Sequence, residues 1–320
     1  MLFCQKEKHG GLSIMEAHHI PDIRRLWLKR RAMFVGVLVL PLLITAGRAE
    51  NGRRYNEKTT VAVNSDKNAL LSGRKLPARQ KAASRQADVP PTAPSKYTFR
   101  PTPALPPVQP HVVSHGNPSE KKIALTFDAC STHAPSHYDE RITKILVETQ
   151  TPATIFLGGK WMEDEPAQTK YLASLPFIEL ENHTFYHPHL TKLSDEQVRN
   201  ELRRTQEAMY TLIGRQPTLY RPPYGEYNER VIKIAARLGL TTVEYSLASG
   251  DPDPHFSKDV LINYVTKMAR NGSIIVMHIN GRGWHTAEAL PEIIARLRAR
   301  GFIFVTVSDL IHSEQKLSVH

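Results

Sequence analysis

The sequence predicts an α/β protein whose parallel strands alternate with helices and close into a barrel. Three observations lead to this prediction. From residue 121 onward, short apolar runs alternate with amphipathic segments, which is typical of parallel sheets. Six or seven such units in about 190 residues favour a barrel over an open sheet. Polar side chains that can bind metals or carry protons follow five of the apolar runs, and in a barrel the carboxyl ends of the strands form one rim.

The first 49 residues are typical of an export signal. Basic residues between positions 24 and 31 precede an apolar run at 32–46. This run is shorter than the ~20 residues that a membrane span needs, and Gly47 and Ala49 offer the small side chains that a signal peptidase reads. We therefore expect a signal peptide, or alternatively an uncleaved signal anchor, and a protein that is periplasmic, bound to the cell envelope or secreted.

Residues 50–118 predict a disordered, basic, Pro-rich linker. Ten prolines lie between Pro77 and Pro118, and without sustained hydrophobic periodicity the segment cannot bury enough apolar surface to offset its ordering entropy. Residues 1–120 hold 19 basic and 8 acidic side chains, whereas residues 121–320 hold 23 of each. The excess positive charge thus lies outside the folding region. It argues against a nucleic-acid-binding face and suits a tether near an anionic cell-envelope surface, or a tail kept soluble by charge.

The pattern from 119 to 312 predicts a single domain, followed by a short tail at 313–320. The predicted strands are short apolar runs at 122–127, 153–158, 177–181, 217–221, 241–247, 273–277 and 302–306. The predicted helices are amphipathic segments at 138–149, 160–174, 194–213, 226–238, 257–270 and 285–299. Ser194 and Gln197 have the spacing of a capping box, and Gly239 and Gly301 follow helices as C-terminal caps do.

Five strand ends carry polar side chains with recognisable chemistry. These residues are Asp128, the pair His183 and His187, Arg221, Asp251 and His278. Two imidazoles four residues apart lie on one face if the segment is helical, and they suit zinc or a similar divalent ion. A carboxylate at the rim can bind metal or act as a general base, a guanidinium can keep it ionised, and a histidine can act as a general acid. The structural alternatives are surface or capping histidines, a helix-capping aspartate, a salt bridge at a turn and a satisfied core histidine.

The order of these residues resembles the polysaccharide deacetylases of carbohydrate esterase family four, which include chitin, chitooligosaccharide and peptidoglycan deacetylases. The resemblance covers nearly the whole folding region and depends on five short motifs in order. The motifs are Thr126-Phe-Asp128, His183-x-x-x-His187, Arg221-Pro-Pro-Tyr224, the Asp251 loop and Met277-His278. The fold that the resemblance implies is a distorted (β/α) barrel of about seven strands.

The resemblance implies an acid–base apparatus. Asp128 matches the catalytic base, and Arg221 matches the residue that orients this base. His278 matches the general acid, with Asp251 at the position that tunes it. Such a pair would activate water at an acetamide carbonyl and protonate the leaving amine.

The resemblance also implies contacts to metal and substrate. His183 and His187 match metal ligands, with zinc the expected ion and cobalt or another divalent ion as alternatives. The backbone N–H of Tyr224 matches a donor to the oxyanion, which places Tyr224 at the substrate. From the residues themselves, Trp284 in the tract 281–286 can stack on a sugar ring, or the tract can be a plain loop in which Thr286 caps the next helix.

One position departs from the family pattern. The family usually has a second Asp directly after the base, serving as the third metal ligand, and this chain has Ala129 there. Two imidazoles alone hold a divalent ion poorly. Asp139 folded back from the next helix, Cys130 as a thiolate, or Asp128 shifted onto the metal can replace the missing ligand. We expect Asp139, because the loop before it is long enough to return it to the rim. If none of the three binds, the site is degenerate.

The predicted function is a metal-dependent hydrolase that removes N-acetyl groups from a glycan of the cell envelope, either peptidoglycan or a chitin-like amino-sugar polymer. Two alternatives keep the fold. Ala129 would fit a pseudoenzyme that only binds glycan at the rim, whereas the retention of Asp128, Arg221 and His278 argues for catalysis. An esterase acting on O-acetyl groups of a polysaccharide would use the same metal, base and acid.

Overall fold

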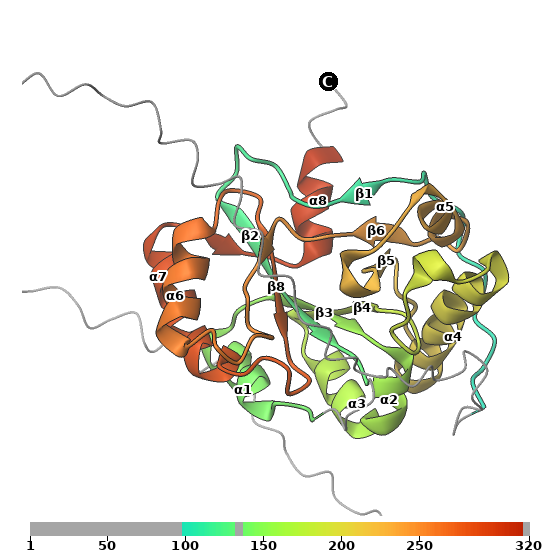
Figure 1. Cartoon of the computed structure of the whole chain (residues 1–320), viewed down its shortest axis with the longest axis horizontal. Helices are drawn as coiled ribbons and strands as arrows, with labels where there is room; N and C mark the ends of the chain where they lie inside the picture. The colour runs from blue at the N-terminus through green and yellow to red at the C-terminus, as the bar shows by residue number, and fades with distance from the viewer. Residues whose placement is uncertain (1–97, 132–136, 316–320) are drawn as a thin grey trace, which may run out of the picture. The chain divides into compact units, whose positions relative to one another are not determined.

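A computed structural model describes residues 98–131 and 137–315 of the chain (Figure 1). The predicted signal segment and the predicted linker up to residue 97 lie outside the described residues, as do the last five residues of the predicted tail. Among the residues that are described, no helix is both long and apolar enough to cross a membrane.

The centre of the domain is a curved sheet in which every named strand pair is parallel (Figure 1). The strands are β1 (Val112–Val113), β2 (Lys122–Ala129), β3 (Ala153–Leu157), β4 (Ile178–Asn182), β5 (Leu219–Tyr220), β6 (Thr241–Val243), β7 (Leu247–Ala248), β8 (Ile274–His278) and β9 (Ile303–Phe304). Their order is β1-β6-β5-β4-β3-β2-β8-β7, and β9 pairs with β2 off this path. The predicted parallel α/β barrel is confirmed, in the form of an open half-barrel.

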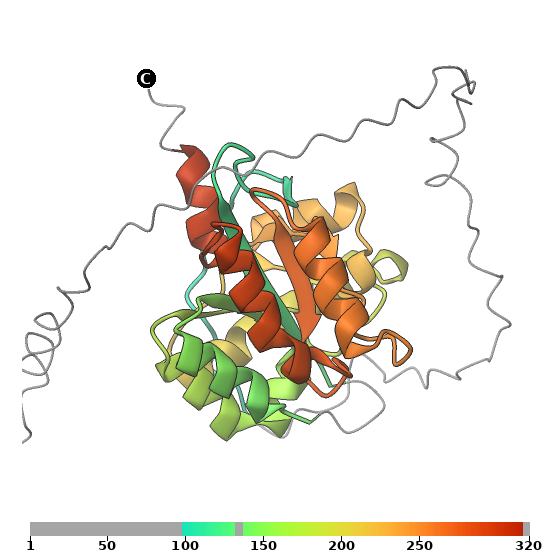
Figure 2. The ribbon, with the colours of Figure 1, turned by 90° about the vertical axis from the view of Figure 1, so that its left-hand side faces the viewer.

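Helices cover the outer surface of this sheet. They are α1 (Glu140–Thr149), α2 (Gly159–Asp164), α3 (Pro166–Ser174), α4 (Asp195–Ile213), α5 (Glu229–Arg237), α6 (Lys258–Met268) and α7 (Thr286–Ala299). Helix α8 (Val307–Gln315) differs, because its Val307 and Leu310 pack in the cluster of interior-facing strand residues. Figure 2 shows α6 and α7 side by side on one flank of the sheet. The predicted capping box is present at α4, where Ser194 and Gln197 bond each other's backbone N–H. The predicted helix 160–174 is two helices, because Pro166 starts a new one.

Two segments differ from the sequence prediction. The predicted strand 241–247 is divided at Glu244, so that its first part pairs with β5 and its last part with β8. One short stretch of chain therefore supplies strands on both sides of the opening in the barrel. Residues 98–118, which fall in the predicted linker, contain β1 and bond to the domain through Val108 N–H to Ala236 O and Gly116 N–H to Gly272 O.

Strand alternation decides which β2 side chains face the site. Leu125, Phe127 and Ala129 belong to the core cluster that also contains residues of α1 and α7. Ala124 belongs instead to a cluster with residues of β3, β5, β6 and β8, which lie around the barrel interior. Because side chains alternate along a strand, Asp128 is on the interior side with Ala124. Residue 130, directly after β2, is in the same phase.

Candidate active site

The carboxyl ends of the strands bring the predicted residues together. Asp128 lies next to the last residue of β2, and its strand register pairs it with His278 at the end of β8. His183 directly follows β4, and Arg221 directly follows β5. Asp251 follows β7 after a short turn. The predicted gathering of ligand-type and acid–base side chains at one rim is therefore present in the fold.

Asp128 is held by a buried guanidinium. Arg221 Nη1 donates to Asp128 Oδ1 at 2.8 Å and to Thr126 Oγ1 at 2.8 Å, and the guanidinium lies over the Phe156 ring. Arg221 is 1% exposed, so little solvent screens this ion pair. Burial by itself raises the pKa of Asp128, but the charges of Arg221, His183 and His278 outweigh it and lower the pKa. Asp128 is therefore an ionised acceptor directed into the site.

His183 presents one nitrogen to the site. Its Nδ1 lies 2.9 Å from the carbonyl oxygen of Arg221, which can only accept, so Nδ1 carries the proton and Nε2 keeps its lone pair. Nε2 lies 3.7 Å from Asp128 Oδ2. Burial lowers the pKa of His183 despite the neighbouring Asp128 charge. The neutral ring with a free Nε2 is the form that binds a metal.

His187 is a second neutral imidazole beside the first. The ring centroids of His183 and His187 are 4.9 Å apart. Burial, followed by the charge of His183, lowers the pKa of His187 well below the ordinary value. Its Nδ1 is buried without a hydrogen-bond partner in the described part of the chain. The pair lies on a loop instead of a helix face, and Thr184 and His187 both have positive φ, at 65° and 59°.

Glu201 accepts hydrogen bonds from the backbone of this loop, and it was not identified from the sequence. Its Oε2 accepts hydrogen bonds from the backbone N–H groups of Phe185 at 2.9 Å and Tyr186 at 2.8 Å. Both groups lie between the two histidines, so Glu201 fixes the loop that positions them. Burial raises the pKa of Glu201 to about 7, although the two backbone bonds oppose this shift. The sequence signal for Glu201 was a glutamate on the apolar face of the predicted helix 194–213. A carboxylate that is buried on such a face needs hydrogen-bond partners.

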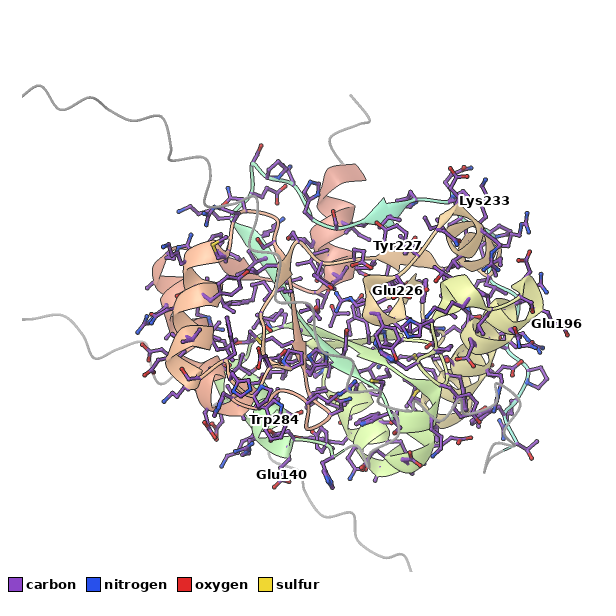
Figure 3. All side chains as sticks on the ribbon, in the orientation of Figure 1. Glu140, Glu196, Glu226, Tyr227, Lys233 and Trp284 are labelled. Atoms are coloured by element: carbon purple, nitrogen blue, oxygen red, sulfur yellow. The ribbon has the colours of Figure 1, made fainter. Side chains whose placement is uncertain are left out.

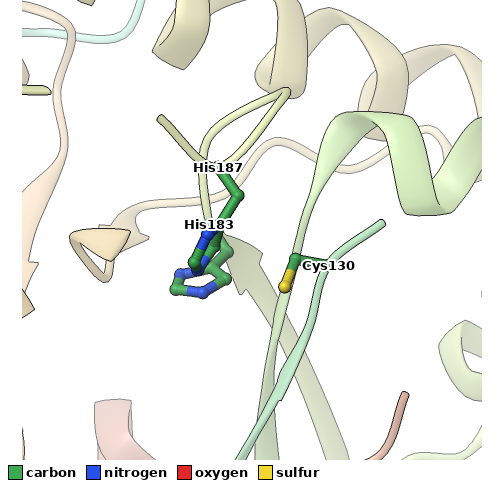
Figure 4. A group of neighbouring side chains, drawn as sticks. All are labelled: Cys130, His183 and His187. Carbon is green, nitrogen blue, oxygen red and sulfur yellow. The ribbon is translucent and has the colours of Figure 1, made fainter. Parts of the chain in front are cut away.

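The third side chain near the histidines is Cys130. Its Sγ and one nitrogen of each imidazole all lie within 4.8 Å of one another (Figure 4). Burial raises the pKa of the thiol to about 11, against the charge of Arg282. Asp139 is placed elsewhere: its carboxylate caps α1 at Arg141 N–H and forms a paired bond to the Arg141 guanidinium at 2.9 and 2.8 Å. The geometry thus brings Cys130, and not the expected Asp139, to the imidazoles.

These groups fit a divalent metal. An unpaired buried His187 Nδ1, a His183 Nε2 with a free lone pair and a soft sulfur donor form a mixed nitrogen and sulfur set. Zinc accepts both donor types, and a catalytic zinc site keeps a position open beside three protein ligands. The orphaned nitrogen has a physical explanation if a cation binds there.

Asp251 and His278 form a second pair, in which the carboxylate is buried and the imidazole is partly buried. Asp251 is 1% exposed and accepts from His278 N–H at 2.7 Å, His278 Nδ1 at 2.9 Å, Thr286 Oγ1 at 2.7 Å and Ser249 Oγ at 3.0 Å. Burial lowers the pKa of His278, but the charge and hydrogen bond of Asp251 outweigh it and raise the pKa. His278 therefore keeps a proton more readily than a free histidine. Ser249 and Thr286 are supporting residues that were not assigned to the site from the sequence.

Two exposed aromatic residues lie on loops that are connected to the site. Tyr224 has a positive φ of 60°, and its exposed ring stacks on His189 at 4.2 Å and meets His187 edge-on at 4.6 Å. Trp284 is 57% exposed, and its backbone N–H donates to Asp251 O. Trp284 is labelled in Figure 3. The loop that carries Trp284 is thus tied to the Asp251–His278 pair.

Comparisons with known proteins agree with this arrangement. Residues 115–243 match the family model described as polysaccharide deacetylase. The chain is 32% identical over 203 residues to peptidoglycan-N-acetylmuramic acid deacetylase PdaA of Bacillus subtilis, covering 62% of this chain and 75% of PdaA. It is 30% identical over 214 residues to a peptidoglycan-N-acetylglucosamine deacetylase of Bacillus cereus, covering 65% of this chain and 75% of that protein.

Solved structures with the same fold include an enzyme and a pseudoenzyme. The structure of Bacillus subtilis PdaA, a family 4 carbohydrate esterase, matches with a TM-score of 0.58 and 28% identity, over 71% of this chain and all of that one. A CE4 family pseudoenzyme from Bacillus anthracis matches with a TM-score of 0.58 and 26% identity, over 63% of this chain and 69% of that one. A mutant of that pseudoenzyme has restored enzymatic activity and the same TM-score.

Proposed function

Because this chain belongs to the polysaccharide deacetylase family, we propose that it hydrolyses the N-acetyl groups of an amino-sugar polymer in the cell envelope, with peptidoglycan as the favoured substrate. The observation that carries the proposal is the pairing of Asp128 with Arg221 and of His278 with Asp251 at the same rim as the two histidines. The relatives that act on peptidoglycan favour this polymer over chitin.

Asp128 is the proposed general base. Its lowered pKa keeps it ionised at neutral pH, and Arg221 occupies Oδ1 while Oδ2 faces His183. Oδ2 is therefore free to accept a proton from a water that attacks the acetamide carbonyl. His183 and His187 would hold a divalent metal, zinc by preference, which would supply Lewis-acid polarisation of that carbonyl.

His278 is the proposed general acid. Asp251 fixes its Nδ1 proton, so that Nε2 is the atom that transfers a proton to the leaving amine. The raised pKa keeps the ring protonated at a higher pH than usual. The backbone N–H of Tyr224 is the proposed oxyanion donor, and Trp284 is the proposed stacking surface for a sugar ring.

A glycan-binding pseudoenzyme is the second candidate, because Ala129 stands where the family usually has a metal ligand and because a pseudoenzyme shares the fold. An O-acetyl esterase is the third, since metal, base and acid would serve an ester equally well. We also propose that the protein is exported and that its basic linker contacts the cell envelope. Both proposals depend on the composition of residues 1–97.

The test measures metal content together with acetate release. Purified protein loaded with zinc or cobalt is given peptidoglycan, N-acetylglucosamine oligomers or O-acetylated xylan, with and without a chelator. Chelator-sensitive acetate release from peptidoglycan supports the proposal. Release from O-acetylated xylan alone would favour the esterase. Glycan binding by a folded, metal-loaded protein that releases no acetate would favour the pseudoenzyme.

A further inference from the structure

The strand phase at the end of β2 distinguishes residues 129 and 130. Ala129 is the last residue of the strand, is completely buried and packs in the outer core cluster under the helices. Asp128 and Cys130 are two residues apart and lie on the opposite side, toward the rim. A side chain at position 129 would therefore face the helices while the strand keeps this register. The next side chain available to the site is the thiol of Cys130.

The backbone of Cys130 is fixed from two sides. Asn280 Nδ2 donates to the carbonyl oxygen of Cys130 at 2.7 Å and lies 3.5 Å from its Sγ. On the other side, Gly158 N–H donates to Ala129 O, and a Cβ at Gly158 would lie 3.3 Å from the Cα of Cys130. Cys130 is 3% exposed, so its side chain is confined as well. The sulfur is held in place before any ligand arrives.

One nitrogen of each imidazole lies within 4.8 Å of this sulfur. Figure 4 shows the Cys130 sulfur beside the rings of His183 and His187. His187 Nδ1 is buried and unpaired within the described residues, and His187 is more than nine-tenths buried. Asp139 is engaged by Arg141 through both carboxylate oxygens, and Asp128, whose Oδ1 is bound by Arg221, is not among the three converging donor groups. The donor atoms that remain are Cys130 Sγ, one nitrogen of His183 and one nitrogen of His187.

We propose that Cys130 is the third metal ligand, so that its thiolate replaces the carboxylate that other family members place directly after the base. The donor set is Cys130 Sγ, one nitrogen of His183 and one nitrogen of His187. The thiol proton passes to solvent as the sulfur–metal bond forms, which balances the charge of the step. This inference rests on the metal dependence in the proposed function. It also leaves Asp128 free of the metal and available as base.

A sulfur ligand would set the metal preference of the site. A thiolate ligand shifts metal preference toward thiophilic ions such as zinc and cobalt and away from magnesium. A carboxylate ligand at the same point would not give this preference.

The test is the absorption spectrum of the cobalt-loaded full-length protein. We expect one Co²⁺ per chain and a sulfur-to-cobalt charge-transfer band in the near ultraviolet. Cys130→Ser should abolish the band and weaken metal affinity by more than about 100-fold, since loss of even a supporting residue beyond the ligands costs 10- to 100-fold. Cys130→Asp should bind Co²⁺ without the band. Cys4→Ser, the matched control at the second cysteine of the chain, should keep the band.

Several results would overturn the inference. These are stoichiometric cobalt without a sulfur band, a band that survives Cys130→Ser, unchanged affinity in that variant, or no metal binding by the folded protein. Chelator-sensitive acetate release without the band would reject the inference and keep the proposed function. A band without acetate release would keep the inference and reject the proposed function.

Discussion

The replacement Asp251→Asn tests the proposed acid through protein stability as well as catalysis. Asp251 accepts four hydrogen bonds, two of them from His278. An asparagine has a single acceptor oxygen, so it keeps at most two of these bonds, and its NH₂ group needs acceptors that the site offers poorly. The His278 ring also loses the negative charge that keeps it protonated.

The destabilisation caused by Asp251→Asn should depend on pH. The pKa of His278 is raised in the folded protein, so its pairing with Asp251 stabilises fully below the unfolded pKa of about 6.5 and is lost as pH rises through the folded value. We expect a loss of about 3–5 kcal/mol in the free energy of unfolding at pH 5, the cost of breaking a buried pair. The loss should fall to about 1–3 kcal/mol once His278 is neutral in the wild type.

Urea unfolding from pH 5 to pH 10 measures this difference, and kcat for acetate release should fall by about 100-fold or more, the range for general acid catalysis. Asp253→Asn is the matched control, because Asp253 is exposed on the same turn and bonds only a local backbone N–H. It should change neither quantity. A destabilisation by Asp251→Asn that is equal at all pH values, or that grows with pH, would refute the assigned pairing.

Three further variants test separate parts of the site. Arg221→Leu leaves Asp128 buried without its partner, so it should cost about 3–5 kcal/mol in urea unfolding, and the doubly apolar Arg221→Leu with Asp128→Leu should recover part of that stability while remaining inactive. Glu201→Leu leaves two buried backbone N–H groups without acceptors, so it should lower the free energy of unfolding by about 2–4 kcal/mol and weaken zinc binding in calorimetry. Glu201→Gln keeps the accepting oxygen and should have a smaller effect on both quantities. Gly283→Ala, at a glycine without positive φ, places a Cβ 2.7 Å from Asp251 Oδ2 and should lower stability by about 1–3 kcal/mol and reduce kcat.

Much of the rim was predictable because strand ends are visible in the sequence. Asp128, Arg221 and His278 each follow a buried apolar run, and parallel strands must bring such positions to one edge. Strand β1 was not predictable, since a two-residue pairing of Val112 and Val113 with β6 depends on backbone bonds and leaves no periodicity. Residues 98–118 are rich in proline and show no hydrophobic periodicity, so the sequence indicated a linker there.

Asp139 does not return to the histidines as expected, because loop length says nothing about which side chain a strand directs inward. Asp139 could reach the rim by contour length, but it is the N-cap of α1 and pairs with Arg141 two residues later. The predicted start of the helix at 138 hid this cap. A predicted helix start at residue 140 would have made Asp139 the N-cap. Whether Cys130 shares the phase of Asp128 depended on β2 continuing to Ala129, which its composition did not reveal.

Backbone strain and opposed pKa shifts bear on the choice between enzyme and pseudoenzyme. Thr184, His187 and Tyr224 have positive φ, and all three lie on the loops that place the second imidazole and the proposed oxyanion donor. Such conformations cost of order 1–3 kcal/mol each and persist where the surrounding structure enforces them. The environments of Asp128 and His278 move their pKa values in opposite directions, down for the proposed base and up for the proposed acid. A surface that only binds glycan needs neither shift, whereas a base and an acid that share one carbonyl need both. The partners that produce the shifts, Arg221 and Asp251, are both in place, so the substitution at Ala129 stands alone against an otherwise complete set.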